Sequence, residues 1–166
     1  MKNYQNPMQE AVTIVEAQSS EEYRIGMTLF QEYLAYVGLD LAFQEVEKEL
    51  QLLDQQYGRP TGVLLLVKIE GVFQGCVGVR DKGDGICELK RMYLKPACRG
   101  KKVGKTLLDK AISLAQEIGY TKMRLDTLAS MIPANKLYQS TGFYEIPAYY
   151  HNPLEDVKYY EKNLEP

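Results

Sequence analysis

LKPACRGKKVGK, residues 94–105, joins the end of a strand-like stretch to the most regular helical pattern of the chain, residues 103–118. The first turn of a helix leaves backbone N–H groups without intrahelical partners and carries the positive end of the helix dipole, so it attracts phosphate. Gly100 and Gly104 let a phosphate come close to the backbone. The cations of the loop strengthen this attraction: Arg99, Lys101, Lys102 and Lys105. The segment therefore predicts a phosphate-binding loop at the start of a helix.

Hydrophobic periodicity extends this plan in both directions along the chain. A capping box of Ser19 and Glu22 begins a helix that Gly38 ends. Its apolar spacing is carried by Ile25, Leu29, Tyr33 and Val37. A second helix is expected over 41–54, with Glu49 on its polar face. We expect strands over 12–17, 63–69, 72–79, 86–94, 122–128, 143–146 and 157–164, and a short helix over 133–140. This order is a mixed α/β plan in one domain, residues 11–166, after a loose polar tail, residues 1–10.

Length and charge narrow the class of protein. The 166 residues suit one domain, and 45% hydrophobic residues suffice for a core. With 20 basic against 22 acidic residues the net charge is −2, which argues against a nucleic-acid binder. The longest apolar run, Val63–Val67, is far shorter than the roughly 20 residues of a membrane helix, and the N-terminus does not resemble a signal peptide. We therefore expect a cytoplasmic protein without nucleic-acid or membrane partners.

Scarce residue types limit the chemistry. Cys76, Cys87 and Cys98 are odd in number and evenly spaced, which suits neither a disulfide framework nor a zinc site. They are expected to be buried thiols, and no metal is expected. A hydrolytic triad would need the single histidine, His151, which has no nucleophile motif beside it. A Walker A loop would need glycine where the chain has Arg99. Hydrolase and P-loop chemistry are therefore disfavoured.

The loop resembles the pyrophosphate motif of the GNAT superfamily of acetyl-coenzyme A-dependent N-acetyltransferases, Gln/Arg-x-x-Gly-x-Gly/Ala. Here the motif spans Arg99–Gly104, and Lys102 stands at its first glycine, where we expect an ordinary backbone conformation. The sequence Ala-Asn-Lys-Leu-Tyr at 134–138, the Gly-Phe pair at 142–143 and the order of elements also resemble the family. The similarity covers about residues 11–164, and its specific motifs lie within 86–144.

The resemblance implies an α/β fold of the α+β type. Its central sheet is mixed and mostly antiparallel, has helices on both faces, and is splayed between two parallel central strands, 87–95 and 122–128. Acetyl-CoA is the implied co-substrate. Its pantetheine arm would pair with the backbone of Met92 and Leu94, and Asn135 would reach the arm or the bound thioester. The pyrophosphate would lie on the N–H groups of Arg99, Gly100, Lys101, Lys102, Val103, Gly104 and Lys105.

The resemblance also suggests catalytic residues. The N–H of Leu94 would donate to the tetrahedral oxyanion. Glu88 lies six residues before Leu94, on the same face if strand alternation holds. In the family a Glu so placed is often a general base, but here it could simply pair with Lys90. Tyr138 would protonate the coenzyme A sulfur, and its alternative role is core packing beneath Phe143.

The acceptor side carries weaker signals. Lys90, Arg91 and Asp126 are expected near the mouth of the slot, either orienting a polar acceptor or forming a structural ion-pair network, which is slightly favoured. The aromatic segment 148–153, with Tyr149, Tyr150 and His151, is expected between the last two strands and is predicted to contact the acceptor. These patterns indicate an amine acceptor without identifying it.

The function predicted from this resemblance is transfer of an acetyl group from acetyl-CoA to a primary amine, by direct attack in a ternary complex. The acceptor would be a small-molecule or peptide amine, and a homodimer is left open. A catalytically silent acyl-CoA sensor of the same fold is the alternative, as is an interaction module that uses the helix pair over 19–54. The presence of both Glu88 and Tyr138 favours catalysis.

Overall fold

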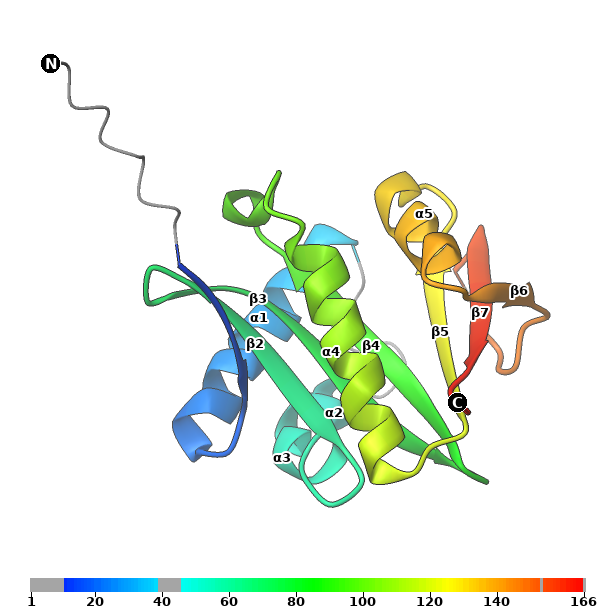
Figure 1. The fold of residues 1–166 in the computed structure, drawn as a ribbon, viewed down its shortest axis with the longest axis horizontal. Coiled ribbons are helices and arrows are strands. Elements are labelled where there is room, and N and C mark those ends of the chain that lie inside the picture. Colours follow the sequence, from blue (N-terminus) through cyan, green and yellow to red (C-terminus); the bar gives the residue numbers. More distant parts are fainter. Residues whose placement is uncertain (1–10, 39–45, 153, 166) are drawn as a thin grey trace, which may run out of the picture.

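A computed structural model describes residues 11–38, 46–152 and 154–165 of the chain. Seven strands form one sheet in the order β1-β2-β3-β4-β5-β7-β6 (Figure 1). The strands are β1 (Val12–Glu16), β2 (Val63–Ile69), β3 (Val72–Gly83), β4 (Ile86–Leu94), β5 (Lys122–Leu128), β6 (Tyr144–Ile146) and β7 (Val157–Asn163). The helices are α1 (Ser20–Tyr36), α2 (Val46–Gln51), α3 (Leu53–Gln56), α4 (Val103–Ile118), α5 (Ile132–Ser140) and the 3-10 turn η2 (Pro96–Cys98). The predicted tail, 1–10, lies outside the described residues.

The sheet is antiparallel except between β4 and β5, which run parallel. That parallel pairing covers three residue pairs, from Ile86 opposite Lys122 to Glu88 opposite Arg124. Beyond Glu88 the two strands diverge toward the end of the sheet where α5 lies (Figure 1). The predicted fold class, including the splay between two parallel central strands, is confirmed.

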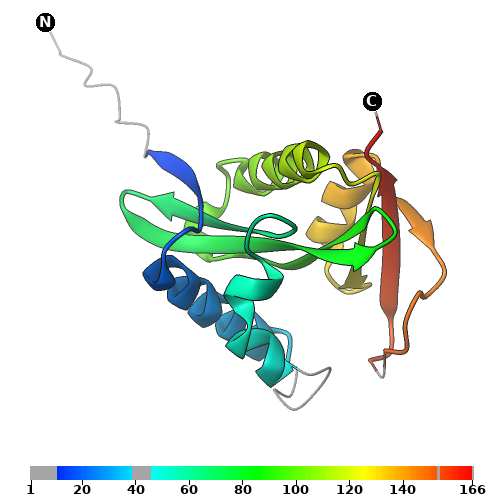
Figure 2. The ribbon, with the colours of Figure 1, turned by 90° about the horizontal axis from the view of Figure 1, so that it is seen from below.

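Helices cover both faces of the sheet (Figure 2). On one face, α4 buries Leu107, Leu108 and Ala111 against β2–β5, because these residues recur at helical spacing. On the other face, α1 and α3 form a second core in which the Phe30 ring meets the Tyr57 ring edge-on, with centroids 5.3 Å apart. The two cores fix the sheet between helical layers and hold the diverging end of β4 in place.

Helix α1 begins at the predicted capping box. The Ser19 hydroxyl accepts from the Glu22 N–H at 3.2 Å, and the Glu22 carboxylate accepts from the Ser19 N–H at 3.1 Å. Its most buried side is made by Gly26, Leu29, Phe30 and Leu34. A Cβ at Gly26 would lie 2.4 Å from Leu64 Cδ2, so glycine lets the helix approach the sheet closely there. Tyr33, seven residues after Gly26, lies close to the same side of the helix and is half-buried.

The helix predicted over 41–54 is interrupted. Residues 39–45 lie outside the described part of the chain, and α2 is separated from α3 at Leu52, whose φ and ψ are −110° and 25°. The assignment of Glu49 to the polar face is wrong, since this side chain is buried. Burial is tolerated because Arg91 and Tyr57 both bind its carboxylate.

A β-bulge interrupts β4 at Arg91. Cys76 pairs with Tyr93 and Gly78 pairs with Lys90, so β4 carries one more residue than β3 in this interval. Arg91 takes a positive φ of 56°. The bulge resets the alternation of side chains, so the expectation that Glu88 and Leu94 share a face is wrong. Leu94 faces the α4 core, as Leu89 and Met92 do, whereas Glu88 points to the opposite side of the sheet.

The three cysteines are buried thiols, as predicted. Across the described residues, none of the helices has both the length and the apolar character that crossing a membrane would require.

Candidate active site

A groove of about 860 Å³ opens where β4 and β5 part. Its floor is the end of β4, and α1, α5 and the start of α4 contribute to its walls. Five residues predicted for the cofactor or the chemistry line it: Met92, Leu94, Arg99, Gly104 and Tyr138. The groove therefore brings together the end of the splayed strand, the loop before α4 and the candidate acid.

The backbone of β4 presents donors to this groove. The Lys95 N–H donates to the Gln74 carbonyl of the neighbouring segment at 2.8 Å. Because N–H directions alternate along a strand, the N–H of Leu94 points the other way, toward the side that β5 has left. A ligand lying in the groove would meet this N–H at its floor.

The first turn of α4 also directs backbone N–H groups outward. No side chain caps this helix, and its first intrahelical bond runs from the Thr106 N–H to the Lys102 carbonyl at 3.2 Å. A Cβ added to Gly104 would lie 3.4 Å from both Leu137 Cδ2 and Leu94 Cδ1. The glycine thus keeps the groove open beside the first turn, where a phosphate would find both space and donors.

Lys102 does not have the ordinary backbone conformation expected for it. Its φ of 55° and ψ of 25° are left-handed, the region that glycine occupies most easily. The chain needs this conformation to turn from η2 into α4, so the lysine adopts the backbone geometry of the family's glycine. A left-handed lysine costs roughly 1 kcal/mol.

The other loop residues lie around the groove without lining it. Gly100 has a positive φ of 72° at the exposed turn, and Val103 is buried in the α4 core. The Lys101 ammonium donates to the Ala97 carbonyl at 3.1 Å, and Lys105 pairs with Asp109 at 2.7 Å. The basic side chains therefore lie on the solvent side of the loop. They can attract a phosphate by their charge, but they do not form the wall of the groove.

Tyr138 is buried on the groove wall, with its side chain 6% exposed. Its ring meets the Phe143 ring edge-on, with centroids 5.8 Å apart, and its hydroxyl donates to the Met92 sulfur at 3.7 Å. Burial raises the pKa of this phenol, so it keeps its proton at neutral pH. A thioether is a weak acceptor, so the Tyr138 hydroxyl can donate its hydrogen bond to a better acceptor that enters the groove.

Asn135 does not reach the groove. Its amide nitrogen donates to the carbonyls of Leu128 at 2.9 Å and Met131 at 2.8 Å, and its oxygen accepts from the Tyr160 hydroxyl at 2.8 Å. These bonds tie the start of α5 to β5 and β7. The side chain predicted to contact the pantetheine arm is instead engaged within the protein.

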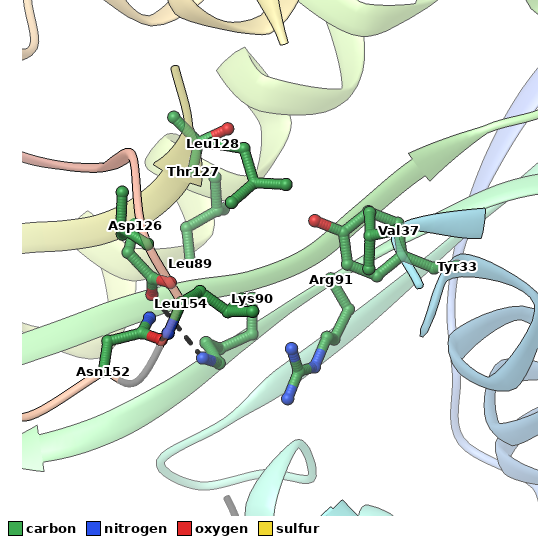
Figure 3. Close-up of a pocket in the computed structure, with 11 residues that line it drawn as sticks. Tyr33, Val37, Leu89, Lys90, Arg91, Asp126, Thr127, Leu128, Asn152 and Leu154 are labelled. Atoms are coloured by element: carbon green, nitrogen blue, oxygen red, sulfur yellow. Dashed lines mark hydrogen bonds and ion pairs between the residues drawn. The ribbon is translucent and has the colours of Figure 1, made fainter. Parts of the chain in front are cut away.

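A smaller cavity of about 40 Å³ adjoins the groove (Figure 3). Tyr33, Val37 and Leu128 line both spaces. The polar part of the smaller cavity comes from Lys90, Arg91, Asp126, Thr127 and Asn152. The structure thus brings together the charged trio that was expected near the mouth of the slot.

Glu88 is held in an ion cluster. Its Oε1 accepts from Arg80 Nη2 at 2.8 Å and Nε at 3.0 Å, and its Oε2 accepts from the Tyr149 hydroxyl at 2.6 Å. Burial alone would raise the pKa of Glu88, but Lys90, Arg80 and Tyr149 together lower it to about 2. Both oxygens are engaged and the carboxylate has little affinity for a proton at neutral pH, which favours the ion-pair role over that of a base.

Arg91 belongs to a second buried pair. Its Nε and Nη2 donate to the two oxygens of Glu49 at 3.2 and 2.9 Å, and the Tyr57 hydroxyl donates to Glu49 at 2.8 Å. This bidentate contact, reinforced by Tyr57, holds the bulge of β4 against α2. The strained backbone at Arg91 is therefore supported by the helical layer beneath it.

The aromatic segment after β6 supports the site more than it lines it. The Tyr149 ring is tilted against that of Tyr150 and meets that of Tyr159 edge-on, with centroids 5.2 and 5.4 Å away, while its hydroxyl donates to Glu88. His151 is exposed, and the structure places neither it nor the two tyrosines at 149 and 150 on the cavity wall. Of the described residues in this segment, 148–152, Asn152 is the one that reaches the cavity.

The lining residues that sequence reasoning missed include Tyr33, Val37 and Asn152. The spacing in α1 groups the first two with buried positions, and only the packing of α1 beside the groove shows that they line the cavity. The Asn-Pro pair at 152–153 is typical of a turn, which would have drawn attention to that position but not to the cavity.

The family model described as "Acetyltransferase (GNAT) family" matches residues 27–143 of the chain. The chain therefore belongs to the GNAT family and is an acyl-CoA-dependent N-acetyltransferase. An uncharacterized N-acetyltransferase of Schizosaccharomyces pombe is 44% identical over 133 residues, which cover 79% of this chain and 82% of that protein.

Solved structures share the fold. A GNAT-family acetyltransferase from Staphylococcus aureus Mu50 has a TM-score of 0.77 at 22% identity, covering 93% of this chain and 100% of its own. The PaiA N-acetyltransferase of Thermoplasma acidophilum, solved in complex with coenzyme A, has a TM-score of 0.68 at 20% identity, covering 92% of this chain and 99% of its own. At these identities the likeness concerns the fold alone.

Proposed function

We propose that the protein transfers the acetyl group of acetyl-CoA to a primary amine, by direct attack within a ternary complex. The observation that carries this proposal is the Tyr138 hydroxyl, which stays protonated on the wall of a groove whose floor is the open end of β4. A groove that only bound coenzyme A would not need a proton donor there.

The groove and loop divide the binding of acetyl-CoA between them. The pantetheine arm pairs with the outward backbone groups of Met92 and Leu94, like an added strand. The pyrophosphate lies on the N–H groups of the Arg99–Lys105 segment, where Gly104 leaves room beside the backbone. The thioester then lies near Tyr138, at the end of the groove that adjoins the smaller cavity.

The chemistry begins once the acceptor ammonium has released a proton to solvent and become a neutral amine. The amine nitrogen attacks the thioester carbon, an N–C bond forms, and the carbonyl electrons move to oxygen, where the Leu94 N–H stabilises the negative charge. Collapse of the intermediate breaks the C–S bond. The sulfur takes a proton from Tyr138, and the proton lost by the neutral amine restores the phenol. Thioester and amine thus become amide and thiol without net gain or loss of protons.

Glu88 has a positioning role in this proposal. Its carboxylate fixes Arg80, Tyr149 and the ammonium of Lys90, which lies 3.8 Å away, and so shapes the acceptor side. We further propose that residues 11–166 act as one catalytic unit, a view supported by the single sheet that β1 and β7 share.

The test is release of coenzyme A thiol from acetyl-CoA, measured with a panel of small amines, amino acids, polyamines and peptide N-termini. Amine-dependent release with matching formation of the N-acetyl product is the expected result. Tight binding of acetyl-CoA without release for any amine would replace this proposal with the silent sensor.

A further inference from the structure

The smaller cavity is where an acceptor would place the part of its structure that does not react. It shares Tyr33, Val37 and Leu128 with the groove, so an amine at that junction would face the thioester while its other end entered the cavity. This inference rests on the proposed function.

The Lys90 ammonium lines this cavity and makes no hydrogen bond to the described part of the chain. Its side chain is 6% exposed, and its contacts among the described residues are Glu88 Oε1 at 3.8 Å and Asp126 Oδ1 at 3.7 Å. Figure 3 shows Lys90 and Asp126 directed toward one another across the cavity. Both distances exceed the usual N–H···O range, and Glu88 Oε1 already accepts twice from Arg80. A buried ammonium with three donors therefore has unused capacity.

Asp126 is in the complementary position. Among the described residues its carboxylate has one ion-pair partner, the same Lys90 ammonium. Lys90 and Asp126 thus face each other in the cavity at a distance too long for a hydrogen bond. A ligand that carries both an acceptor and a donor could bind both groups at once.

The balance of charges around the cavity favours binding of a negative group. Within the described ranges, the ion pairs in and around the cavity join four cations, Arg80, Lys82, Lys90 and Arg91, to three carboxylates, Glu49, Glu88 and Asp126. A volume of about 40 Å³ holds a carboxylate but not a large side chain. The charge and the size both favour a small anionic group at Lys90.

We propose that the acceptor is an α-amino acid whose carboxylate binds the Lys90 ammonium and whose amino group lies beside Asp126, at the junction with the groove. The side chain of the acceptor then extends past Leu154, on the exposed rim. Lys90 is in this view the residue that distinguishes amino acids from simple amines.

The experiment compares each free amino acid with its α-amide, which keeps the amine but removes the carboxylate. L-Aspartate, L-lysine and L-methionine, each paired with its α-amide, sample acidic, basic and apolar side chains. The enzymes are the wild type, Lys90→Met, Lys90→Arg and the exposed control Lys110→Met. The readouts are kcat/KM for thiol release and, with coenzyme A bound, calorimetric affinity for the unreacted amino acid and amide.

The wild type and Lys110→Met should prefer at least one free acid over its amide by about 10²-fold, as expected for loss of a buried charge partner. Lys90→Met should lose the preference while its KM for acetyl-CoA stays unchanged, and Lys90→Arg should restore part of it. Equal use of acids and amides by the wild type, or an intact preference in Lys90→Met, would overturn the inference. If no amine releases thiol, the proposed function fails instead, and the calorimetric preference alone decides whether Lys90 binds a carboxylate.

Discussion

The hydroxyl of Tyr138 lies 3.7 Å from the sulfur of Met92, across the groove from the backbone that would hold the thioester. In Tyr138→Phe the ring and its packing on Phe143 remain, but the proton for the departing thiolate is lost. Turnover should fall by roughly 10²–10⁴-fold, with little change in affinity for acetyl-CoA. Stability should change by about 1 kcal/mol at most.

Steady-state kinetics and calorimetry measure these two effects separately. Tyr144→Phe is the matched control, because that tyrosine is 42% exposed and lies outside the groove. Wild-type turnover in Tyr138→Phe would return Tyr138 to a packing role and leave water to protonate the thiolate.

Gly104 makes a second prediction about the groove. A Cβ at this position already lies 3.4 Å from Leu137 and Leu94, so the branched side chain of Gly104→Val would fill the space beside the first turn of α4. Affinity for coenzyme A should fall by about tenfold or more. Lys101→Ala should lower it by about threefold at most, since that exposed charge is screened by solvent. A larger effect from Lys101→Ala would mean that charge, not backbone geometry, dominates the loop.

The left-handed Lys102 predicts a stabilising substitution. Lys102→Gly relieves a conformation that costs roughly 1 kcal/mol, against a smaller loss from the freer unfolded chain. Urea unfolding should show a gain of about 0.5 kcal/mol. Lys101→Gly is the control: its φ is not positive, so it should lose stability, and a similar gain there would point to the removed charge as the cause.

The ion pair between Glu49 and Arg91 is predicted to stabilise the bulge of β4. Glu49→Gln leaves Arg91 buried without its carboxylate partner, so the free energy of unfolding should drop by about 3 kcal/mol. Glu47→Gln, on the exposed side of the same helix, should stay within about 0.5 kcal/mol of the wild type. Chemical denaturation at pH 7 compares the two, and equal effects would show that the buried pair adds nothing specific.

Glu88 gives the fold an acid-sensitive component. Its pKa of about 2 lies below the value near 4.3 expected in the unfolded chain, so its contribution is complete above that pH and is lost as pH falls toward 2. The contribution is at most about 3 kcal/mol. The stability difference between wild type and Glu88→Gln should therefore shrink between pH 5 and pH 2, as followed by urea unfolding. The exposed Glu145→Gln should show no such trend, and a constant gap for Glu88→Gln would contradict the cluster.

Elements with strong local signals could be predicted from the sequence. Helix α4 spans the predicted residues because one apolar stripe runs its length and Gly119 ends it in a left-handed conformation. The splay of β4 from β5 was available only through the family resemblance, because no local pattern encodes where two strands part. The groove residues followed from that resemblance and the loop motif together.

The structure of the acceptor side could not be predicted, because it depends on contacts between residues far apart in the sequence. Burial of Glu49 requires Arg91, 42 residues away, and the bulge that presents Arg91 occurs at a non-glycine residue within an ordinary strand pattern. The same bulge places Glu88 and Leu94 on opposite faces of the sheet. A prediction based on the strict alternation of side chains along the strand therefore fails here. Asn135 was placed by its motif, but its bonds to Leu128 and Tyr160 decide its direction.

The three residue pairs between β4 and β5 form a short seam between two halves of the sheet, β1–β4 on one side and β5–β7 on the other. Beyond Glu88 the seam is open, and the cofactor that would lie there meets backbone from one half and α5 from the other. Bound acetyl-CoA would then connect the two halves of the sheet and hold them in a fixed relative position. When the product leaves, the two halves of the sheet would be less rigidly connected. Each turnover would then alternate between a more rigid and a more flexible sheet.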